Sequence, residues 1–474
     1  MKRKSTTYYV SSVNGKDTND GLTQETPFRT LHQIRGRELG AGDRILLERG
    51  SVFEDQYLHI RGKGEKGNLI EIAPYGEGNL PHICANGTGI WYQDYGTRLD
   101  SPAHIYQGNV SSAVLLYDAE YIWIHDLEIS NKDNLTRETT ERTKTGQDVS
   151  GFQNIMEKSA RREDSNSQNI IVEGCEKADC EKINQYSAPH KMDRTGVAVV
   201  AQNGGTLHEI TLQNLMIHDV NGNVYNKHMN NGGIYMTALK PENEEQTGVA
   251  RYDGIKVENC CVWNVSRWGI AVGYTYQHAR FTGAKLQEEC FLQYGHENII
   301  LRNNYVKNAG GDAITPMYAL RPLVEHNISD SCAAEMNDRI YRYAGNRMGK
   351  VAAAIWPWKC KDALFRFNEA VDTRLNQDGM AYDADSGDGT IYEYNYSRLN
   401  EGGCVMFCLE EAIHNTFRKN ISYDDLGGIL SPSGNLDAYV TENQFYIRKG
   451  VPLLRKNMSD GEVTLRNNII TELK

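Results

Sequence analysis

A short unit recurs along the chain from about residue 110, and it constrains the fold more than any other feature. In each unit an alternating apolar strand ends near Asn, a polar stretch follows, and Gly opens a second strand. Repeats that hold several short strands, with no amphipathic helix between them, are typical of a right-handed parallel β-helix. The first strands include 210–214, 255–259, 299–303, 364–368, 391–395 and 463–467, and the second strands open at Gly233, Gly269, Gly311, Gly379, Gly403 and Gly428.

The spacing of the opening glycines predicts one continuous solenoid. Successive glycines are 36, 42, 68, 24 and 25 residues apart, and the 68-residue step holds a second coil whose strand, 351–356, lacks the Gly. A chain of 474 residues would ordinarily form several domains, but each solenoid coil buries its apolar face on its neighbours. We expect an N-terminal cap and first coils over 1–110 and the β-helix over 111–474, with a charged insertion near 132–168.

Composition excludes several partners. The formal net charge is -11, with acidic and basic residues mixed, so nucleic acid is not expected. No apolar stretch is long enough to span a membrane, and the N-terminus lacks the apolar region of a signal peptide. A cytoplasmic protein is predicted, or a secreted or cell-surface one if a signal was trimmed or another subunit carries it. The ten cysteines lack metal-ligand spacing, so we expect reduced core thiols, no metal and no cofactor.

Alternation along the second strands predicts which side chains line a groove. Counting from each opening Gly, the first and third positions should face the core, and the second, fourth and sixth should face solvent. Parallel stacking of the solvent-facing positions would form a floor able to hold an oligosaccharide. The expected core positions are Ile234, Met236, Ile270, Val272, Met380, Tyr382, Cys404 and Met406, and the expected floor positions are Tyr235, Thr237, Thr315, Met317, Asp383, Asp385 and Phe407.

The segment 376–389 concentrates four carboxylates: Asp378, Asp383, Asp385 and Asp388. Crowded carboxylates raise the pKa of at least one member, which suits a general acid beside an ionised partner. Glycosidases use such pairs. Asp388 stands in an Asp-Gly turn and is more typical of a structural residue, whereas Asp383 and Asp385 lie on a strand that needs no turn residue.

Aromatic residues near this segment are candidates for binding sugar. Trp356 and Trp358 stand on the preceding coil and share one face of the strand by alternation. Either of them could instead belong to the core. We also assign substrate binding to Tyr235, Tyr274, Asp312 and Phe407.

The motif Asp378-Gly-Met-Ala-Tyr-Asp-Ala-Asp385, followed by 391–397 and 401–403, resembles the β-helical lacto-N-biosidases of glycoside hydrolase family 136. With the N-terminal segment 8–31, the resemblance spans most of the chain. It implies cleavage of lacto-N-tetraose with retention and release of lacto-N-biose. It further implies Asp385 as nucleophile and Asp378 as acid/base. Some family members carry a helical domain that assists folding, which leaves room for a separately encoded helical partner of this chain.

Strand geometry keeps a second acid/base candidate open. Seven extended residues span about 23 Å, far more than the roughly 5–5.5 Å between the carboxyl groups of a retaining enzyme. The chain between Asp378 and Asp385 would therefore have to bend. Asp383 and Asp385, about 6.7 Å apart along a strand, need no bend, so Asp383 is the substitute acid/base.

Two other functions compete with hydrolysis. A polysaccharide lyase would hold Ca²⁺ with Asp383, Asp385 and Asp388 and use Lys359 as base. A non-catalytic β-helix would only bind carbohydrate, but the unequal coils and the single acidic coil argue against it.

Overall fold

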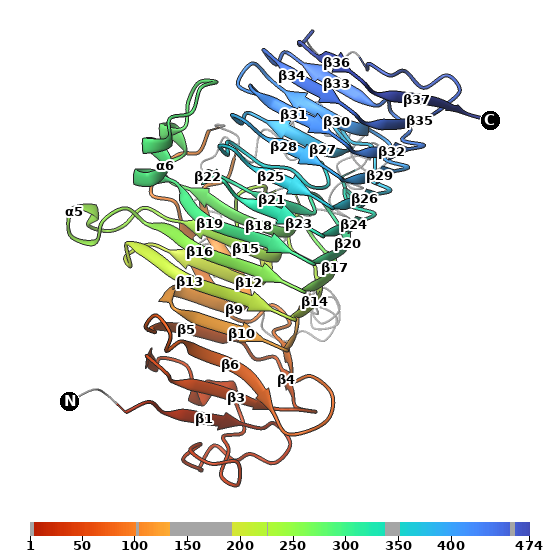
Figure 1. The fold of residues 1–474 in the computed structure, drawn as a ribbon. Coiled ribbons are helices and arrows are strands. Elements are labelled where there is room, and N and C mark those ends of the chain that lie inside the picture. Colours follow the sequence, from red (N-terminus) through yellow and green to blue (C-terminus); the bar gives the residue numbers. More distant parts are fainter. Residues whose placement is uncertain (1–3, 101–103, 133–191, 225, 337–350, 456–459) are drawn as a thin grey trace, which may run out of the picture.

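The computed structural model describes residues 4–100, 104–132, 192–224, 226–336, 351–455 and 460–474. Its chain winds through successive coils, each of which contributes strands to parallel sheets that run the length of the molecule (Figure 1). The N-terminal coils lie at one end of the stack and the C-terminal coils at the other. This arrangement confirms the predicted parallel β-helix.

Three sheets, named A, B and C, form the faces of the solenoid. The strands of sheet A are β1 (Thr7–Val10), β3 (Arg44–Glu48), β6 (Ile70–Tyr75), β10 (Ile122–His125), β13 (Thr206–Gln213), β16 (Arg251–Glu258), β19 (His296–Arg302), β22 (Ala319–Leu320), β23 (Leu323–Glu325), β25 (Leu364–Arg366), β28 (Ile391–Glu393), β31 (Asn415–Arg418), β34 (Ala438–Thr441) and β36 (Thr464–Arg466).

Sheet C follows sheet A within each coil. Its strands are β4 (Val52–Glu54), β7 (His82–Cys84), β11 (Glu128–Asn131), β14 (Met216–Val220), β17 (Cys261–Val265), β20 (Tyr305–Ala309), β24 (Ile328–Asp330), β26 (Glu369–Val371), β29 (Tyr396–Arg398), β32 (Ile421–Tyr423), β35 (Gln444–Arg448) and β37 (Ile469–Leu473).

Sheet B carries the second strands and is built in two parts. Its strands are β2 (Glu38–Gly40), β5 (Leu58–Lys63), β9 (Gln107–Glu120), β12 (Asp193–Ala201), β15 (Gly232–Ala238), β18 (Trp268–Thr275) and β21 (Ile314–Pro316), with β8 (Ile90–Asp94) antiparallel to β9, and then β27 (Met380–Asp385), β30 (Gly403–Cys408) and β33 (Leu430–Ser433). The short helices are η1 (Leu31–Gln33), α5 (Glu244–Thr247), η2 (His278–Arg280) and α6 (Glu288–Tyr294).

Apolar side chains stack in columns inside the solenoid. Ile210, Ile255 and Ile299 occupy one register position in sheet A, and each is at most 1% exposed. Full burial of one such side chain contributes about 2 kcal/mol, so the repeat of apolar residues accounts for the stacking of coils. The stack of coils starts at β1, which pairs with β3, and β9 spans the position at which we divided the chain, between residues 110 and 111. The predicted charged insertion lies almost entirely outside the described residues.

An asparagine ladder joins the coils at the turn between sheets A and C. In it the side-chain oxygen of each Asn after the first accepts hydrogen bonds from the backbone N–H and side-chain amide of the Asn one coil earlier. The amide-to-amide distances are 2.9–3.1 Å. The ladder consists of Asn304, Asn327, Asn368, Asn395, Asn420, Asn443 and Asn468.

The repeated Asn of the sequence pattern corresponds to two adjacent structural positions. Asn368 and Asn395 belong to the ladder. The other four lie one position earlier in the register, in the left-handed backbone region with φ between 53° and 57°. Asn tolerates that conformation well, so the pattern combined two different reasons for placing Asn at the turn. The four residues are Asn214, Asn259, Asn303 and Asn467.

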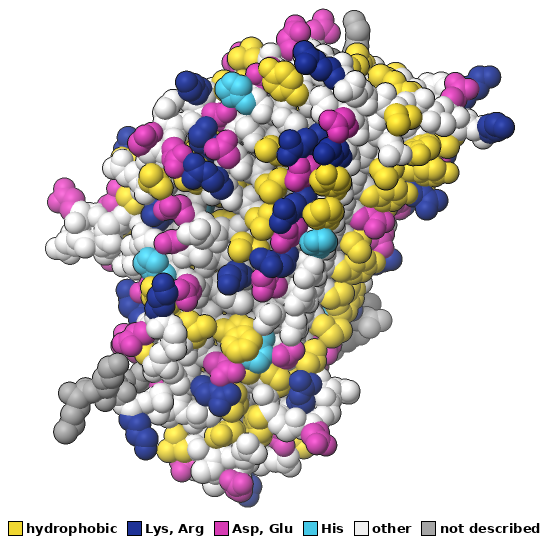
Figure 2. All heavy atoms as spheres, viewed as in Figure 1, with side chains coloured by type: hydrophobic (Ala, Val, Ile, Leu, Met, Phe, Trp, Pro, Cys, Tyr) yellow, Lys and Arg dark blue, Asp and Glu magenta, His cyan; other side chains and the backbone are white. Residues whose placement is uncertain are grey.

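The outer surface of sheet A mixes charges of both signs (Figure 2). Ion pairs link residues of successive coils, such as Arg366 with Glu325 and Arg418 with Glu393. Within the described residues, no helix has the length and apolar character that crossing a membrane requires. The eight described cysteines are free thiols, and Cys260, Cys332, Cys360 and Cys404 are buried.

Candidate active site

Strand β27 carries two of the predicted carboxylates on the outer face of sheet B. Asp383 pairs with Met406 of β30 and Asp385 pairs with Cys408. Asp383, Asp385 and Cys408 each offer a ligand-type atom within 4.8 Å of the others, so these side chains share one face. The predicted orientation of Asp383 and Asp385 is therefore correct.

The predicted orientations of Met406 and Phe407 on strand β30 are wrong, whereas Cys404 lies in the core as expected. Phe407 pairs with Ala384, which lies between the two aspartates, so Phe407 faces the core and cannot contact substrate. Met406, expected in the core, faces outward instead. Gly403, the first residue of this strand, has φ of 118°, and counting from that glycine shifted the alternation. The outward residue that the sequence reasoning missed is Cys408.

Asp378 approaches the same face from a turn rather than from the strand. Gly379 adopts φ of 77°, and the backbone N–H of Asp378 donates to Asn376 Oδ1 at 2.8 Å. The Asn376 side chain also donates to the carbonyl of Ala352 on the preceding coil at 3.1 Å. This turn supplies the bend that a fully extended segment would lack.

The three carboxyl groups differ in pKa and in access. Burial and the charge of Asp385 raise the pKa of Asp378 to about 7. Burial and the charges of Asp385 and Asp378 raise the pKa of Asp383 well above its usual range. Burial also raises the pKa of Asp385, but a hydrogen bond from the Ser386 hydroxyl and the charge of Lys227 oppose that increase. Asp378 and Asp385 are half-buried, whereas Asp383 is 3% exposed.

Trp356 and Trp358 stand beside the aspartates, as predicted. Their rings are 6.0 Å apart at an interplanar angle of 28°, and Trp358 bridges to Asp385 in the sheet. Pro357 separates them, and this coil contributes isolated bridges in place of a regular strand. Sheet B is therefore interrupted where the acidic and aromatic residues meet.

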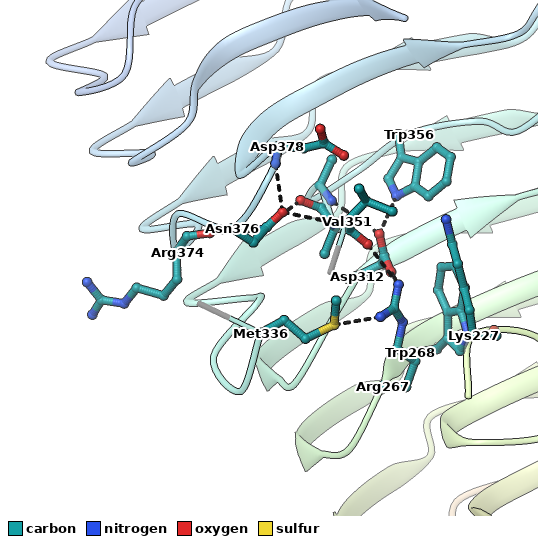
Figure 3. A network of polar contacts seen from close by, with 12 residues as sticks. Lys227, Arg267, Trp268, Asp312, Met336, Val351, Trp356, Arg374, Asn376 and Asp378 are labelled. Carbon is teal, nitrogen blue, oxygen red and sulfur yellow. Dashed lines mark hydrogen bonds and ion pairs between the residues drawn. The ribbon is translucent and has the colours of Figure 1, made fainter. Parts of the chain in front are cut away.

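Asp312 holds this part of the groove in place (Figure 3). Its carboxylate pairs with Arg267 at 2.8 Å and accepts hydrogen bonds from the Trp356 indole at 3.0 Å and the Ala353 backbone at 3.1 Å. Arg267 and Asp312 are both fully buried. The guanidinium, the indole and the backbone N–H already occupy the carboxylate oxygens of Asp312. Asp312 therefore positions Trp356, in place of the direct role in substrate binding that we predicted.

Two segments from outside the sheets, together called the roof, cover the outer face of sheet B next to the aspartates. The groove that we expected to be open is therefore enclosed here. Tyr95 and Asp100 belong to the first segment, and Lys227 and His228 belong to the second. The Tyr95 hydroxyl donates to the His228 carbonyl at 2.6 Å, and Tyr274 Oη donates to Asp100 at 3.1 Å. Tyr274 and the His228 ring stack at 3.9 Å.

Lys227 is the main cation of the groove, and the sequence reasoning missed it. Its ammonium lies 4.5 Å from the ring centre of Trp358 and 5.3 Å from that of Trp356. Figure 3 shows Lys227 beside Trp356. Its charge lowers the pKa of Asp378, Asp383 and Asp385 against the effect of burial. The signal available in the sequence was the polar stretch 221–231, which is too long for a simple turn between two strands.

Several buried polar atoms along the groove lack a hydrogen-bond partner among the described residues. They include the Tyr235 hydroxyl, Thr315 Oγ1, Asp383 Oδ1 and both ring nitrogens of His228. Buried polar groups are normally paired, so a group of unpaired ones marks a place where a polar ligand would complete them. Hydroxyl-rich sugars have the matching donors and acceptors.

The remaining candidates have structural partners. Asp388 pairs with Lys361 at 3.1 Å and with His414 at 2.8 Å, in agreement with its structural assignment. Lys359 pairs with Glu411 at 2.5 Å and so is not a free base for a lyase. A separate cavity of about 660 Å³ lies at the N-terminal coils, lined by His59, Arg61, Trp91 and other residues, and includes none of the aspartates.

A β-helix with a roofed groove that holds carboxylates beside tryptophans defines the class of β-helical glycoside hydrolases. No family model matches the chain. It is similar to two crystal structures of a family 136 lacto-N-biosidase from Eubacterium ramulus, each 55% identical with a TM-score of 0.86. These matches cover 99% and 98% of this chain and 68% of the other. The present chain is also 39% identical to the lacto-N-biosidase of Bifidobacterium longum subsp. longum, in a match that covers 98% of the present chain.

The chain therefore belongs to glycoside hydrolase family 136. It spans 28% of the length of the Bifidobacterium protein.

Proposed function

We propose that this protein is a retaining glycosidase that releases lacto-N-biose from lacto-N-tetraose. The observation that carries the proposal is the cluster of carboxyl groups on β27 and on the turn that precedes it. The cluster lies beside two tryptophans, in a groove whose buried polar atoms include several without a partner among the described residues. The two relatives are named lacto-N-biosidases, which supports lacto-N-biose as the disaccharide released.

We assign the nucleophile to Asp385. Lys227 favours the ionised form of all three carboxyls, but Asp385 also accepts a hydrogen bond from the Ser386 hydroxyl, and it retains surface toward the groove. Attack on the anomeric carbon requires an ionised carboxylate, and the resulting glycosyl ester is hydrolysed in a second step.

We assign the acid/base to Asp378. A pKa of about 7 lets this carboxyl protonate the leaving oxygen and later deprotonate water at neutral pH. The negative charge of Asp385 contributes to the raised pKa. Once that charge is consumed in the glycosyl ester, the pKa of Asp378 should fall, which suits its change from acid to base.

Asp383 then serves as a neutral hydrogen-bonding group. Burial raises the pKa of Asp383 well above its usual range, which favours the protonated form and makes this carboxyl a poor partner for reversible proton transfer. Its Oδ1 has no partner among the described residues and is available to a sugar hydroxyl.

Incubation with lacto-N-tetraose tests the proposal. We expect a disaccharide product that first appears as the β anomer by proton NMR, because two inversions restore the configuration. Absence of disaccharide, or first appearance of the α anomer, would contradict the substrate or the retaining mechanism. Chelator should leave turnover unchanged, since no step assigned here uses a metal, whereas a calcium-dependent lyase would stop.

We also propose that folding of this chain is assisted by a separate helical partner. The chain covers 68% of the Eubacterium chain, so that relative contains sequence that this one does not match. Expression of this chain alone, and together with the unmatched part of the Eubacterium chain, tests the idea. A rise in soluble active protein on coexpression is expected, and equal yields would contradict it.

A further inference from the structure

A cluster of two histidines and a glutamate lies on the outer face of sheet C, on three successive strands. His82 belongs to β7, Glu128 to β11 and His218 to β14. The strand register pairs Glu128 with His82, and Ser130 with His218. One ligand-type atom from each of the three side chains lies within 4.8 Å of the other two.

The three atoms converge at the spacing of ligands around one ion. Glu128 Oε1 is 3.0 Å from His218 Nε2 and 3.7 Å from His82 Nδ1. Ligands that bind zinc tetrahedrally through bonds of about 2.0–2.1 Å lie roughly 3.4 Å from one another. The two measured distances fall on either side of that value.

Both imidazoles have a partner on the nitrogen that points away from the cluster. His218 Nδ1 is 3.0 Å from Asp219 Oδ2, and His82 Nε2 is 2.8 Å from Ser130 Oγ. Metal-binding histidines are commonly oriented in this way by a hydrogen bond from the other ring nitrogen. Trp263 stacks on His218 at 4.5 Å, which further fixes the plane of that ring.

The cluster is also open to solvent. The side chains of His82, Glu128 and His218 are 19%, 29% and 14% exposed, so an ion and a water ligand could reach them from solvent.

A second histidine elsewhere in the fold shows what an ordinary ladder contact looks like. His125 of β10 has Asp126 on Nδ1 at 2.6 Å and Glu71 on Nε2 at 3.2 Å, which repeats the partners of His218. Its two carboxylates lie on opposite ring nitrogens, and it is not part of a converging group of three among the described residues. In contrast to His125, the cluster on sheet C brings a second imidazole to the same Glu128 oxygen.

We propose that His82, Glu128 and His218 form a binding site for a borderline divalent transition metal, best matched by Zn²⁺. Two imidazoles and one carboxylate with an open fourth position are a typical zinc ligand set. The ion would join the three coils of β7, β11 and β14 on a sheet other than the one that carries the aspartates. Its role is therefore structural support of the N-terminal coils.

Zinc titration of the chelator-treated full chain by calorimetry tests this site. One site is expected, whose affinity falls by about 100-fold or more in His82→Gln and in His218→Gln, while His125→Gln binds like the parent. Added Zn²⁺ should raise the melting temperature of the parent and of His125→Gln but not of the two cluster variants.

Cobalt(II) gives a readout that a merely structural role of these side chains would not produce. Co²⁺ should show the visible absorption of a tetrahedral site in the parent, and Glu128→Gln should weaken it at unchanged circular dichroism. Binding that survives at full affinity in both histidine variants would place the ion at another cluster and overturn the proposal. Failure of the parent to bind Zn²⁺ would overturn it as well.

Discussion

The same C-terminal coils contain two contrasting regions, the asparagine ladder between sheets A and C and the groove on sheet B. The ladder repeats one residue type with one bonding pattern through seven positions. The groove has no repeated residue type. The register position of Asp383 on successive strands of sheet B is also occupied by Tyr235, Ala271, Thr315 and Met406.

The two regions also differ in how their buried polar groups are satisfied. Ladder amides bond to one another, whereas groove atoms such as Asp383 Oδ1 and the Tyr235 hydroxyl lack a partner among the described residues. In this solenoid, repeated residues support stability, and residues that occur once support the proposed chemistry. Substitutions in the ladder should therefore lower stability, and substitutions in the groove should lower activity.

Asp385→Asn should produce the largest effect on turnover. Removal of a nucleophile is expected to reduce kcat on lacto-N-tetraose by about 10⁴-fold, because no other group can form the glycosyl ester. The melting temperature should not fall, because a half-buried carboxyl is replaced by an amide of equal volume. Steady-state kinetics and thermal unfolding measure both. Activity above a few per cent would show that this coil is not the active site.

Asp378→Asn should separate substrates by their leaving group. Turnover of the oligosaccharide should fall by about 10²- to 10⁴-fold, since its leaving oxygen must be protonated. The first step on an aryl glycoside of lacto-N-biose should be much less affected, because a phenolate departs without protonation. Burst kinetics on both substrates provide the comparison. Equal losses on the two would remove Asp378 from the acid/base role.

Asn395→Ala tests the ladder and should alter stability without altering the chemistry. Asn395 accepts from the backbone and side chain of Asn368 and donates to the Phe365 carbonyl at 3.0 Å. Its removal leaves these buried groups unpaired, at a cost of about 3 kcal/mol in the free energy of unfolding. Denaturant unfolding measures the loss. A change in kcat of the folded variant would mean that the two regions are coupled.

The contrast also explains how much could be predicted from the sequence. Repetition predicted the β-helix, the second strands and the face of Asp383 and Asp385, because a period is visible without knowing any contact. It could not separate the ladder position of Asn368 from the left-handed position of Asn303, since both favour Asn.

Residues that act from outside the repeat were not predictable. Lys227 and Asp100 reach the groove from loops, and only the folded chain brings them beside β27 and Tyr274. The predicted orientation of Phe407 was wrong because the prediction counted alternating positions from Gly403. That residue is not in the extended conformation, so the alternation does not start there. The roles of Asp378, Asp383 and Asp385 remain predictions that the variants above and below address.

Lys227→Met should move the pH profile with a smaller effect on rate. The charge of Lys227 lowers the pKa of Asp385, so its removal should raise that pKa. The acid limb of kcat/KM would then move to higher pH, and at a fixed pH on that limb the rate should fall about tenfold when the pKa rises by one. Lys361→Met is the control, because Lys361 pairs with Asp388 outside the groove. An unmoved acid limb would show that Lys227 does not tune the nucleophile.

Asp383→Asn should have the smallest effect on activity and is the sharpest test of the acid/base assignment. Burial and two neighbouring carboxylates raise the pKa of Asp383 well above its usual range, so the folded protein favours its protonated form. Asn has nearly the same volume and, like a protonated carboxyl, offers a donor group and an acceptor oxygen. We therefore expect a change of less than about tenfold in kcat/KM on lacto-N-tetraose, and the same change on an aryl glycoside.

The same substitution should increase stability at neutral pH, and the sign of this change follows from the direction of the pKa shift. At pH values above the ordinary pKa of an aspartate, the raised pKa makes Asp383 harder to ionise in the folded chain than in the unfolded chain, and this difference disfavours folding. Asn removes that cost, so the melting temperature of Asp383→Asn should exceed that of the parent at pH 7, and the gap should close as the pH falls below about 4. A residue that lowers stability but stays ionisable is expected at a functional site. A loss above about 10³-fold on the oligosaccharide, with the aryl glycoside spared, would instead make Asp383 the acid/base and return Asp378 to a supporting position.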